Sequence, residues 1–296
     1  MVTLSAARVD VLRERLNAFV DERDLKARIA ADPVEFPHRY RDPRDVEVVA
    51  LLSASLAYGR ASLFKPKIDA LLANMGKSPA NFVANLTVID AASLLRDFVY
   101  RFNVGADVAT LLLGIGEMLN THGSLEKLFV STQKNAVHWR FGLADFSTTI
   151  VKAAPTREIT KHLGKTRGLA HLLPSAAAGP AKRQHLFLRW LVRGPDAVDF
   201  GIWKSVDPAS LTIPLDTHVA RLSTLLGFTK RADISWRTAD EVTAALRLLD
   251  PLDPTKYDFA LCHYGMSGVC PAVPIKVNCA VCSLRSECKV GRKFRE

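Results

Sequence analysis

The chain has 296 residues, of which 48% are hydrophobic, so it exceeds one average domain and can bury a substantial core. It has no apolar stretch of the roughly 20 residues that cross a bilayer, and Met1 to Asp10 lacks the basic start and apolar stretch of a secretory signal. We therefore expect a cytoplasmic protein without a membrane partner. Forty Lys and Arg against 30 Asp and Glu give a net charge of +10, which favours a polyanionic partner without identifying it, because basic surfaces also serve anionic lipids or solubility.

Apolar residues recur mostly at helical spacing, and strand patterns are scarce. The first predicted helix contains Leu12, Leu16 and Phe19, and the second begins near Val48 after a turn-rich stretch. Thr238 followed by Glu241 predicts a capping box at the start of the last long helix. Further helices are predicted at residues 67–75, 91–101, 108–119, 184–192, 219–226 and 239–249, each bounded by Gly, Pro, Asp, Asn or a polar cluster.

Residues 131–180 mix aromatic side chains with many basic ones. Trp139, Phe141 and Phe146 are followed by five Lys and Arg residues between 152 and 167. Aromatics interleaved with cations suit nucleic-acid contact, through base stacking and phosphate pairing. A solvated helical face over a core gives the same composition and is the reading we favour.

A turn of small residues at 175–180 separates two apolar stretches. Leu172, Leu173 and Pro174 precede it, and Lys182 and Arg183 open the helix that follows. Small residues let backbone amides approach a phosphate closely, and the N-terminus of a helix adds positive potential. The pattern indicates two helices joined by a hairpin, although any helix pair with a Gly-Pro turn shares it.

Asp216 stands directly before a predicted helix that has Val219 and Leu222 on one face. The ordinary interpretation of an acid at this position is an N-cap, whose carboxylate accepts backbone N–H bonds. The segment 215–219 around it also allows a catalytic interpretation, which rests on a family resemblance.

Four of the five cysteines fall in the last 27 residues, with eight, two and five residues between successive members: Cys270, Cys279, Cys282 and Cys288. A two-residue separation lets two thiolates converge on one centre, and flanking cysteines complete a four-ligand site. Both an iron–sulfur cluster and a zinc ion fit four thiolates. Cys262 lies on an apolar segment, and we expect it to be a small core residue.

In chain order these segments resemble the helix-hairpin-helix DNA glycosylases of the endonuclease III type. Those enzymes carry a Leu-Pro-Gly hairpin with a catalytic Lys, a Val-Asp-Thr-His-Val segment with an essential Asp, and a four-cysteine loop holding a [4Fe-4S] cluster. The matching positions here are Leu173 with Pro174 and Lys182, then 215–219, then the four cysteines. The resemblance extends over about residues 45–290, and the runs 56–60 and 214–221 are similar to a bacterial branch of unknown function.

The chain departs from that family in three places. Eight residues, rather than six, separate the first two cysteines, and the hairpin has Ala176, Ala177, Ala178 and Gly179 in place of a Gly-x-Gly core. The interval from Lys182 to Asp216 is 34 residues, against roughly 18 in the family. Whether this insertion, 194–210, displaces Lys182 from the site or leaves it within reach of Asp216 stays open at this point.

The resemblance implies an all-α, two-lobed fold. The first lobe, 45–200, would be a six-helix barrel with the hairpin, and the second, 1–44 plus 201–296, would carry Asp216 and the [4Fe-4S] loop. It also implies DNA contacts. We expect these at Ser175, Ala178, Gly179, Arg183, Tyr58, Arg60, Lys276 and Arg285, where Tyr58 or Arg60 would replace the glutamine that fills the gap left by a flipped base.

The implied function is base excision repair by a monomer in the cytoplasm, associated with the nucleoid. Such an enzyme flips a damaged or modified base out of double-stranded DNA and hydrolyses its N-glycosidic bond through Asp216. If Lys182 reaches the sugar, it would add strand-cleaving lyase activity through a Schiff base. Two alternatives stay open: a binding protein for nucleic-acid structures in which Asp216 only caps its helix, and a zinc ion in place of the cluster.

Overall fold

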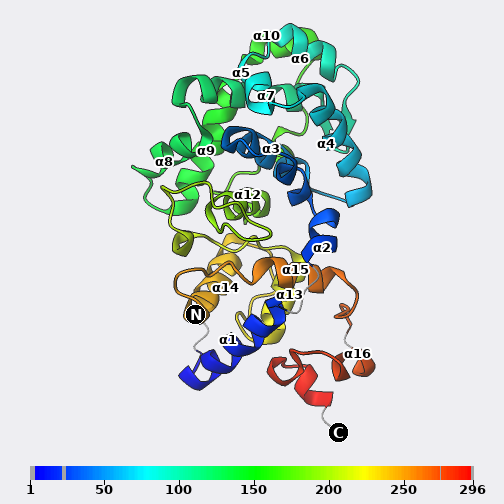
Figure 1. Ribbon diagram of the computed structural model, residues 1–296, viewed down its shortest axis with the longest axis vertical. Coiled ribbons are helices and arrows are strands. Elements are labelled where there is room, and N and C mark those ends of the chain that lie inside the picture. Colours follow the sequence, from blue (N-terminus) through cyan, green and yellow to red (C-terminus); the bar gives the residue numbers. More distant parts are fainter. Residues whose placement is uncertain (1–3, 22–24, 274, 295–296) are drawn as a thin grey trace. The chain divides into compact units, whose positions relative to one another are not determined.

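The computed structural model describes residues 4–21, 25–273 and 275–294. The predicted all-α class is confirmed: helices dominate, and the only sheet among these residues is one two-stranded hairpin (Figure 1). No helix in the described part of the chain has the length and apolar composition needed to cross a membrane.

The chain divides into two compact units. Unit 1 comprises residues 1–28, 180–199 and 206–296, and unit 2 comprises 29–179 and 200–205. The predicted lobes cut the chain at 45 and 200, so residues 180–199 fall with the barrel in that division and with the C-terminal part in the structure. The short helix α2 (Leu25–Ala31) contains one boundary.

Unit 2 is built around α7 (Gly105–His122), which is buried along nearly its whole length. The helices α5, α6, α8, α9 and α10 pack against it (Figure 1). The bounds of the remaining elements are η1 (Pro33–Glu35), η2 (Pro37–Arg39), α3 (Pro43–Leu56), α4 (Ala61–Met75), α5 (Pro79–Ala84), α6 (Val88–Leu95), β1 (Val99–Tyr100), β2 (Asn103–Val104), α8 (Leu125–Gln133), α9 (Trp139–Ala153), α10 (Thr156–Leu163) and α11 (Leu169–Leu172).

The predicted helix at 91–101 is wrong in its second half. The helix α6 ends at Leu95, and Val99 to Val104 form the antiparallel hairpin β1–β2 with a two-residue turn. Val and Tyr favour extended backbone, and the apolar residues at 98–100 fit a strand as well as a helix. The predicted helix therefore extends beyond the true end of α6 at Leu95.

Residues 131–180, the segment of mixed aromatic and basic composition, fold mainly as α9 and α10. Phe146 is fully buried, whereas Phe141 is 39% exposed. The segment thus contributes one face to the core of unit 2 and leaves its basic residues on the outside.

Unit 1 has its own hydrophobic core. Leu12, Leu16 and Phe19 of α1 pack with apolar residues from the C-terminal half, including Val219 and Leu246. Its elements are α1 (Ala6–Asp21), α12 (Lys182–Val192), η3 (Pro208–Ser210), α13 (Thr217–Leu226), α14 (Trp236–Leu249), α15 (Asp258–Met266), α16 (Lys276–Ala280), η4 (Arg285–Glu287) and η5 (Gly291–Phe294).

The capping box predicted at Thr238 is wrong. The helix α14 begins at Trp236, and its N-cap is Ser235, whose side chain accepts the N–H of Thr238. Thr238 is buried and lies in the first turn. Both residues are good N-caps by type, and the apolar pattern alone could not place the start of the helix three residues earlier.

Candidate functional site

Asp216 is held at the start of α13 by the first turn of that helix and by the anchored segment that precedes it. Its Oδ1 accepts the N–H of Val219 at 2.8 Å, which is the geometry of an N-cap. The strand-like approach to it is anchored by Ile213 and Leu215, both buried, and by a bond from the Ile213 N–H to the Thr243 hydroxyl. The predicted cap is therefore present, and it uses only one of the two carboxylate oxygens.

The second carboxylate oxygen of Asp216 forms a salt bridge with Lys182. The Lys182 Nζ lies 2.8 Å from Asp216 Oδ2, and the two side chains are 34% and 14% exposed. Lys182 is the first residue of α12, and it follows Ala181, which has a left-handed φ of 44°. The insertion between Lys182 and Asp216 therefore does not displace Lys182, and the two side chains are in contact.

Cys262 is a third member of this group. Its Sγ lies 3.4 Å from Asp216 Oδ2, and the half-buried residue also packs against the core of unit 1, as its apolar neighbours predict. The helices α13 and α15 come this close because Gly265 lies against His218: a Cβ on Gly265 would be 2.6 Å from the Cβ of His218.

The charges of this group stabilise one another. Burial opposes a charge on Lys182, but Cys262 and Asp216 outweigh it and raise the pKa of Lys182. Burial likewise opposes ionisation of Asp216, yet the Lys182 ammonium and the Val219 N–H lower the pKa of Asp216 below its usual value. At neutral pH the pair is thus an ammonium beside a carboxylate.

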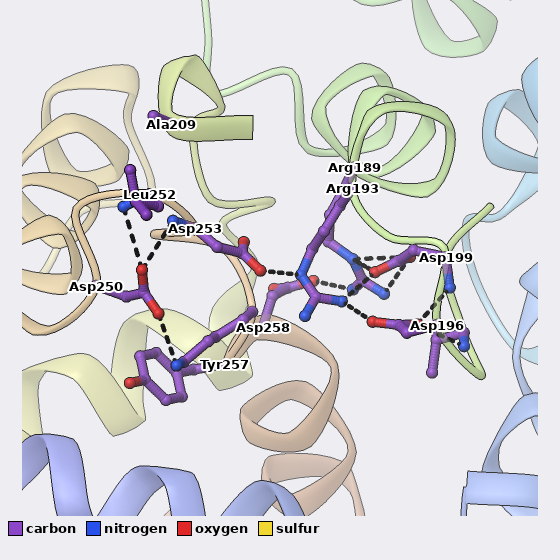
Figure 2. Close-up of polar contacts among 12 residues, drawn as sticks. Arg189, Arg193, Asp196, Asp199, Ala209, Asp250, Leu252, Asp253, Tyr257 and Asp258 are labelled. Carbon is purple, nitrogen blue, oxygen red and sulfur yellow. Dashed lines mark hydrogen bonds and ion pairs between the residues drawn. The ribbon is translucent and has the colours of Figure 1, made fainter. Parts of the chain in front are cut away.

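A buried network of arginines and aspartates holds α12 in place (Figure 2). Arg189 donates to Asp199 at 2.8 Å and to Asp258 at 2.6 Å, and all three side chains are at most 3% exposed. Arg193 bonds Asp199 at 2.7 Å and Asp253 at 2.8 Å. A buried guanidinium is stable only with such partners, so the network fixes the helix that begins with Lys182.

Asp258 connects this network to the candidate site. It is the first residue of α15, the helix that carries Cys262. Burial raises the pKa of Asp258 to about 6, against the pull of Arg189, and Lys182 and Asp216 both act on its charge. The position of Cys262 relative to Lys182 therefore depends on a salt bridge that the solvent does not reach.

The four C-terminal cysteines line one cavity of unit 1. Cys270, Cys279, Cys282 and Cys288 share it with Leu225 and other residues, and it encloses about 370 Å³ including its open side. Two cysteine sulfurs already have donors: Arg221 Nη1 lies 3.1 Å from Cys270 Sγ, and Tyr264 Oη lies 3.0 Å from Cys282 Sγ. Such donors stabilise thiolates, and they accompany metal and cluster ligands.

The four thiols line this cavity without forming a closed metal site among the described residues. Within the described residues, no three or more His, Cys, Asp and Glu side chains are placed to hold a metal ion. Burial and the other three cysteines raise the pKa of Cys279. Four thiolates that line one cavity suit either a zinc ion or an iron–sulfur cluster.

The predicted DNA contacts of the hairpin are placed in a turn that bonds to itself. The carbonyl of Ser175 accepts the N–H groups of Ala178 and Gly179, at 3.1 and 3.2 Å. Ser175 and Ala178 are exposed, and Arg183 is half-buried on α12. Two of the amides expected to contact phosphate therefore already have partners within the turn.

The remaining predicted contacts lie elsewhere in the two units. In unit 1, Lys276 is exposed at the start of α16, and Arg285 is half-buried and donates to the carbonyl of Phe294. In unit 2, Arg60 is exposed at the start of α4, and the Tyr58 hydroxyl donates to the carbonyl of Tyr100 at 3.1 Å.

Comparison with known proteins gives a family and no activity. A search of curated proteins finds no significant match. Residues 32–267 match the family described as "Protein of unknown function (DUF2400)", a span that includes Lys182, Asp216 and Cys262 and ends before Cys270. Since this match covers well over half of the sequence, the chain belongs to the DUF2400 family.

Proposed function

We propose that this protein is a DNA glycosylase of the helix-hairpin-helix superfamily, which hydrolyses the N-glycosidic bond of a damaged or modified base. The observation that carries the proposal is the contact between Lys182 and Asp216. These are the two positions that match the family's catalytic Lys and Asp, and they meet despite an interval twice as long as the family's. A chance match in sequence gives no reason for the two side chains to come together.

In the proposed reaction the bond between the base and C1′ of the sugar breaks, and its electron pair leaves with the base. The sugar then carries positive charge, as in other glycosidic cleavages. The ionised Asp216 stabilises that charge, because its carboxylate is already fixed by Val219 and Lys182 and does not have to reorient. Water adds to C1′, and its proton ends on the departing base.

The state of Lys182 favours water as the nucleophile. A Schiff base requires a neutral amine, and the raised pKa of Lys182 keeps its nitrogen protonated. We therefore propose a monofunctional enzyme, in which Lys182 is a positioning residue that keeps Asp216 ionised. Lyase activity through Lys182 is the alternative that a borohydride trapping experiment would detect.

We further propose that Cys270, Cys279, Cys282 and Cys288 hold a [4Fe-4S] cluster. The four cysteines line one cavity, which supports a shared centre, and the resemblance to the endonuclease III type favours the cluster over a zinc ion. When bound, the cluster would supply a cross-link between the segments that carry these cysteines.

The proposed partner is double-stranded DNA containing a damaged or modified base, and the protein would act on it as a monomer in the cytoplasm, at the nucleoid. The net charge of +10 supports a polyanionic partner. The exposed cations Arg60 and Lys276 are available to DNA phosphates.

Mass spectrometry of the free bases released from chemically damaged and naturally modified genomic DNA tests the proposal without assuming a lesion. We expect the wild-type protein to release one base and Asp216→Asn to release none. Release by neither protein would overturn the proposal and favour a non-catalytic binding protein, in which the bond from Val219 makes Asp216 a plain N-cap. Equal release by both proteins would remove Asp216 from the reaction.

A further inference from the structure

Unit 2 carries a surface cluster of aromatic and cationic side chains that the proposed chemistry does not use. Phe102, at the tip of the β1–β2 hairpin, is 51% exposed, and its ring stacks on His171 with centroids 4.4 Å apart and planes 20° apart. The guanidinium of Arg101 lies 5.7 Å from the Phe102 ring and 5.9 Å from the Tyr58 ring. Stacked rings and a cation thus face the solvent together.

Three segments far apart in sequence are joined beneath this cluster. Asn103 is fully buried; its Nδ2 donates to the carbonyl of Gly168 at 2.8 Å, and its Oδ1 accepts from the Tyr58 hydroxyl. Asp107, also buried, accepts the N–H groups of Arg167 and Gly168, each at 3.0 Å. The turn at 57–60, the hairpin tip and the loop at 165–171 therefore form one rigid support for the exposed rings.

The backbone at the hairpin tip is strained. Arg101 has a φ of 52°, a left-handed conformation that a residue other than glycine seldom adopts. Its side chain lies back across Gly59, where an added Cβ would come within 2.7 Å of Arg101 Nη1. Strain of this kind persists where the surrounding structure imposes it, and such positions cluster at ligand sites.

The charged residues around the cluster favour a nucleic-acid ligand over a protein partner. Arg60, Lys165 and Arg167 are exposed on the same three segments as Phe102 and His171. Interfaces between proteins are depleted of Lys at their centres, whereas proteins that bind unpaired nucleic acid combine cations along the backbone with rings on which bases stack. The cluster has the second composition.

We propose that Phe102, His171 and Arg101 form a stacking platform for an unpaired base of DNA, flanked by the phosphate contacts Arg60, Lys165 and Arg167. The proposal rests on the proposed function only for the choice of DNA as the partner. Of these residues, Arg60 was already expected to contact DNA from sequence, and the platform assigns that contact a neighbouring base.

Fluorescence anisotropy with two labelled duplexes tests the platform: one duplex contains a single-nucleotide bulge, and the other has the same sequence without it. We expect wild type to prefer the bulged duplex and Phe102→Leu to bind it about five- to tenfold more weakly, with little change for the continuous duplex. Phe141→Leu is the matched control, because Phe141 is also exposed beside an arginine, Arg140, at 4.6 Å, but belongs to α9. It should bind both duplexes as wild type does.

Arg101→Gly separates binding from folding. Glycine adopts a φ of 52° without strain, so this variant should unfold at the same temperature as wild type or higher, and yet bind the bulged duplex several-fold more weakly. Tighter binding of Arg101→Gly, equal weakening of both duplexes by Phe102→Leu, or preference for an RNA bulge over the DNA bulge would each overturn the platform.

The two proposals fail separately. Base release by wild type together with unchanged bulge binding by Phe102→Leu would overturn the platform and leave the glycosylase intact. Loss of the bulge preference in Phe102→Leu, without base release by any variant, would support the platform and overturn the glycosylase.

Discussion

Arg189 Nη1 donates to Asp258 Oδ2 at 2.6 Å, and this buried contact joins α12, which begins with Lys182, to α15, which carries Cys262 (Figure 2). The geometry of the candidate site therefore depends on an ion pair several residues away from it. Asp199 binds the other side of the same guanidinium, so one arginine neutralises two buried carboxylates.

Replacing Arg189 with Met would leave Asp258 buried without its salt-bridge partner and Asp199 paired with Arg193 alone. We expect the free energy of unfolding to fall by about 3–5 kcal/mol, because an uncompensated buried charge costs far more than the pair contributes. Urea unfolding followed by circular dichroism measures the change. The control is Arg231→Met in the same unit, where solvent screens the pair with Asp233 and the loss should be much smaller. Equal losses in the two variants would contradict the role assigned to the network.

Asp216→Asn separates capping from catalysis. Asparagine caps helices as well as aspartate does, so α13 should stay capped, and any fall in the free energy of unfolding reports the lost pair with Lys182. The rate of base release should fall by about a hundredfold or more, because the carboxylate charge is lost. Asp207→Asn is a matched control, since Asp207 caps η3 through the N–H of Ala209 and is exposed. Its release rate should equal that of wild type.

Lys182→Met should change the pH profile of base release. In wild type, Lys182 lowers the pKa of Asp216, so release persists until the pH falls below the usual range of an aspartate. Without the ammonium, burial raises that pKa, and release should be lost at a higher pH. Lys182→Arg keeps the charge and should keep the wild-type profile. A Lys182 adduct with abasic DNA, trapped by borohydride, would instead identify this lysine as a nucleophile.

Glu47 makes the stability of unit 2 dependent on pH. It is buried, and burial raises its pKa from 4.5 to about 7, although Leu125, Glu126 and Trp203 all donate to it. Between these values the folded state holds a proton that the unfolded state has released. The stabilisation is therefore complete below about pH 4.5 and lost as the pH rises through 7.

We expect the melting temperature of wild type, relative to Glu47→Gln, to fall between pH 5 and pH 8, because the amide does not titrate. Glu117→Gln, at an exposed position, should follow wild type throughout. A difference between wild type and Glu47→Gln that is constant with pH would show that Glu47 is already ionised in the folded protein at pH 5.

The five cysteines provide their own control for the cluster. Cys282→Ser should purify without the brown colour and iron of wild type, because one of the four thiolates is removed. Cys262→Ser should retain both, since Cys262 lies beside Asp216 and does not line the cavity of the other four. A colourless wild-type protein with stoichiometric zinc would contradict the cluster.

Local patterns predicted the features that depend on a few neighbouring residues. The N-cap at Asp216 and the helix that follows it depend on short spacings and are present, whereas the four-cysteine ligand set stays a prediction supported by a common cavity. The contact between Lys182 and Asp216 depends on how the intervening residues fold, and no local pattern reports that. The sequence alone therefore leaves open whether the two side chains meet.

Two site residues were missed for the same reason. Cys262 follows the apolar residues 259–261, so its surroundings predicted core packing, and only α13 on the far side brings Asp216 to it. The sequence does indicate a special role for Arg189, because it is a charged residue within the otherwise apolar helical stretch Leu186 to Val192. A charge at such a position requires a buried partner, although the sequence does not say which aspartate provides it.

Unit 1 is assembled from three separate stretches of chain, and this sets the order in which the protein can be completed during synthesis. The helix made first, α1, finds its partners last: Arg13 bonds the carbonyl of Leu249, and Asn17 accepts from the Tyr257 hydroxyl. Most of unit 2 is one continuous stretch, 29–179, and can gather its core while the ribosome is still adding residues. Until the C-terminal part of unit 1 is synthesised, the apolar face of α1 has no core to pack against. A nascent chain that stalls after unit 2 would therefore expose a hydrophobic helix face, to which chaperones bind.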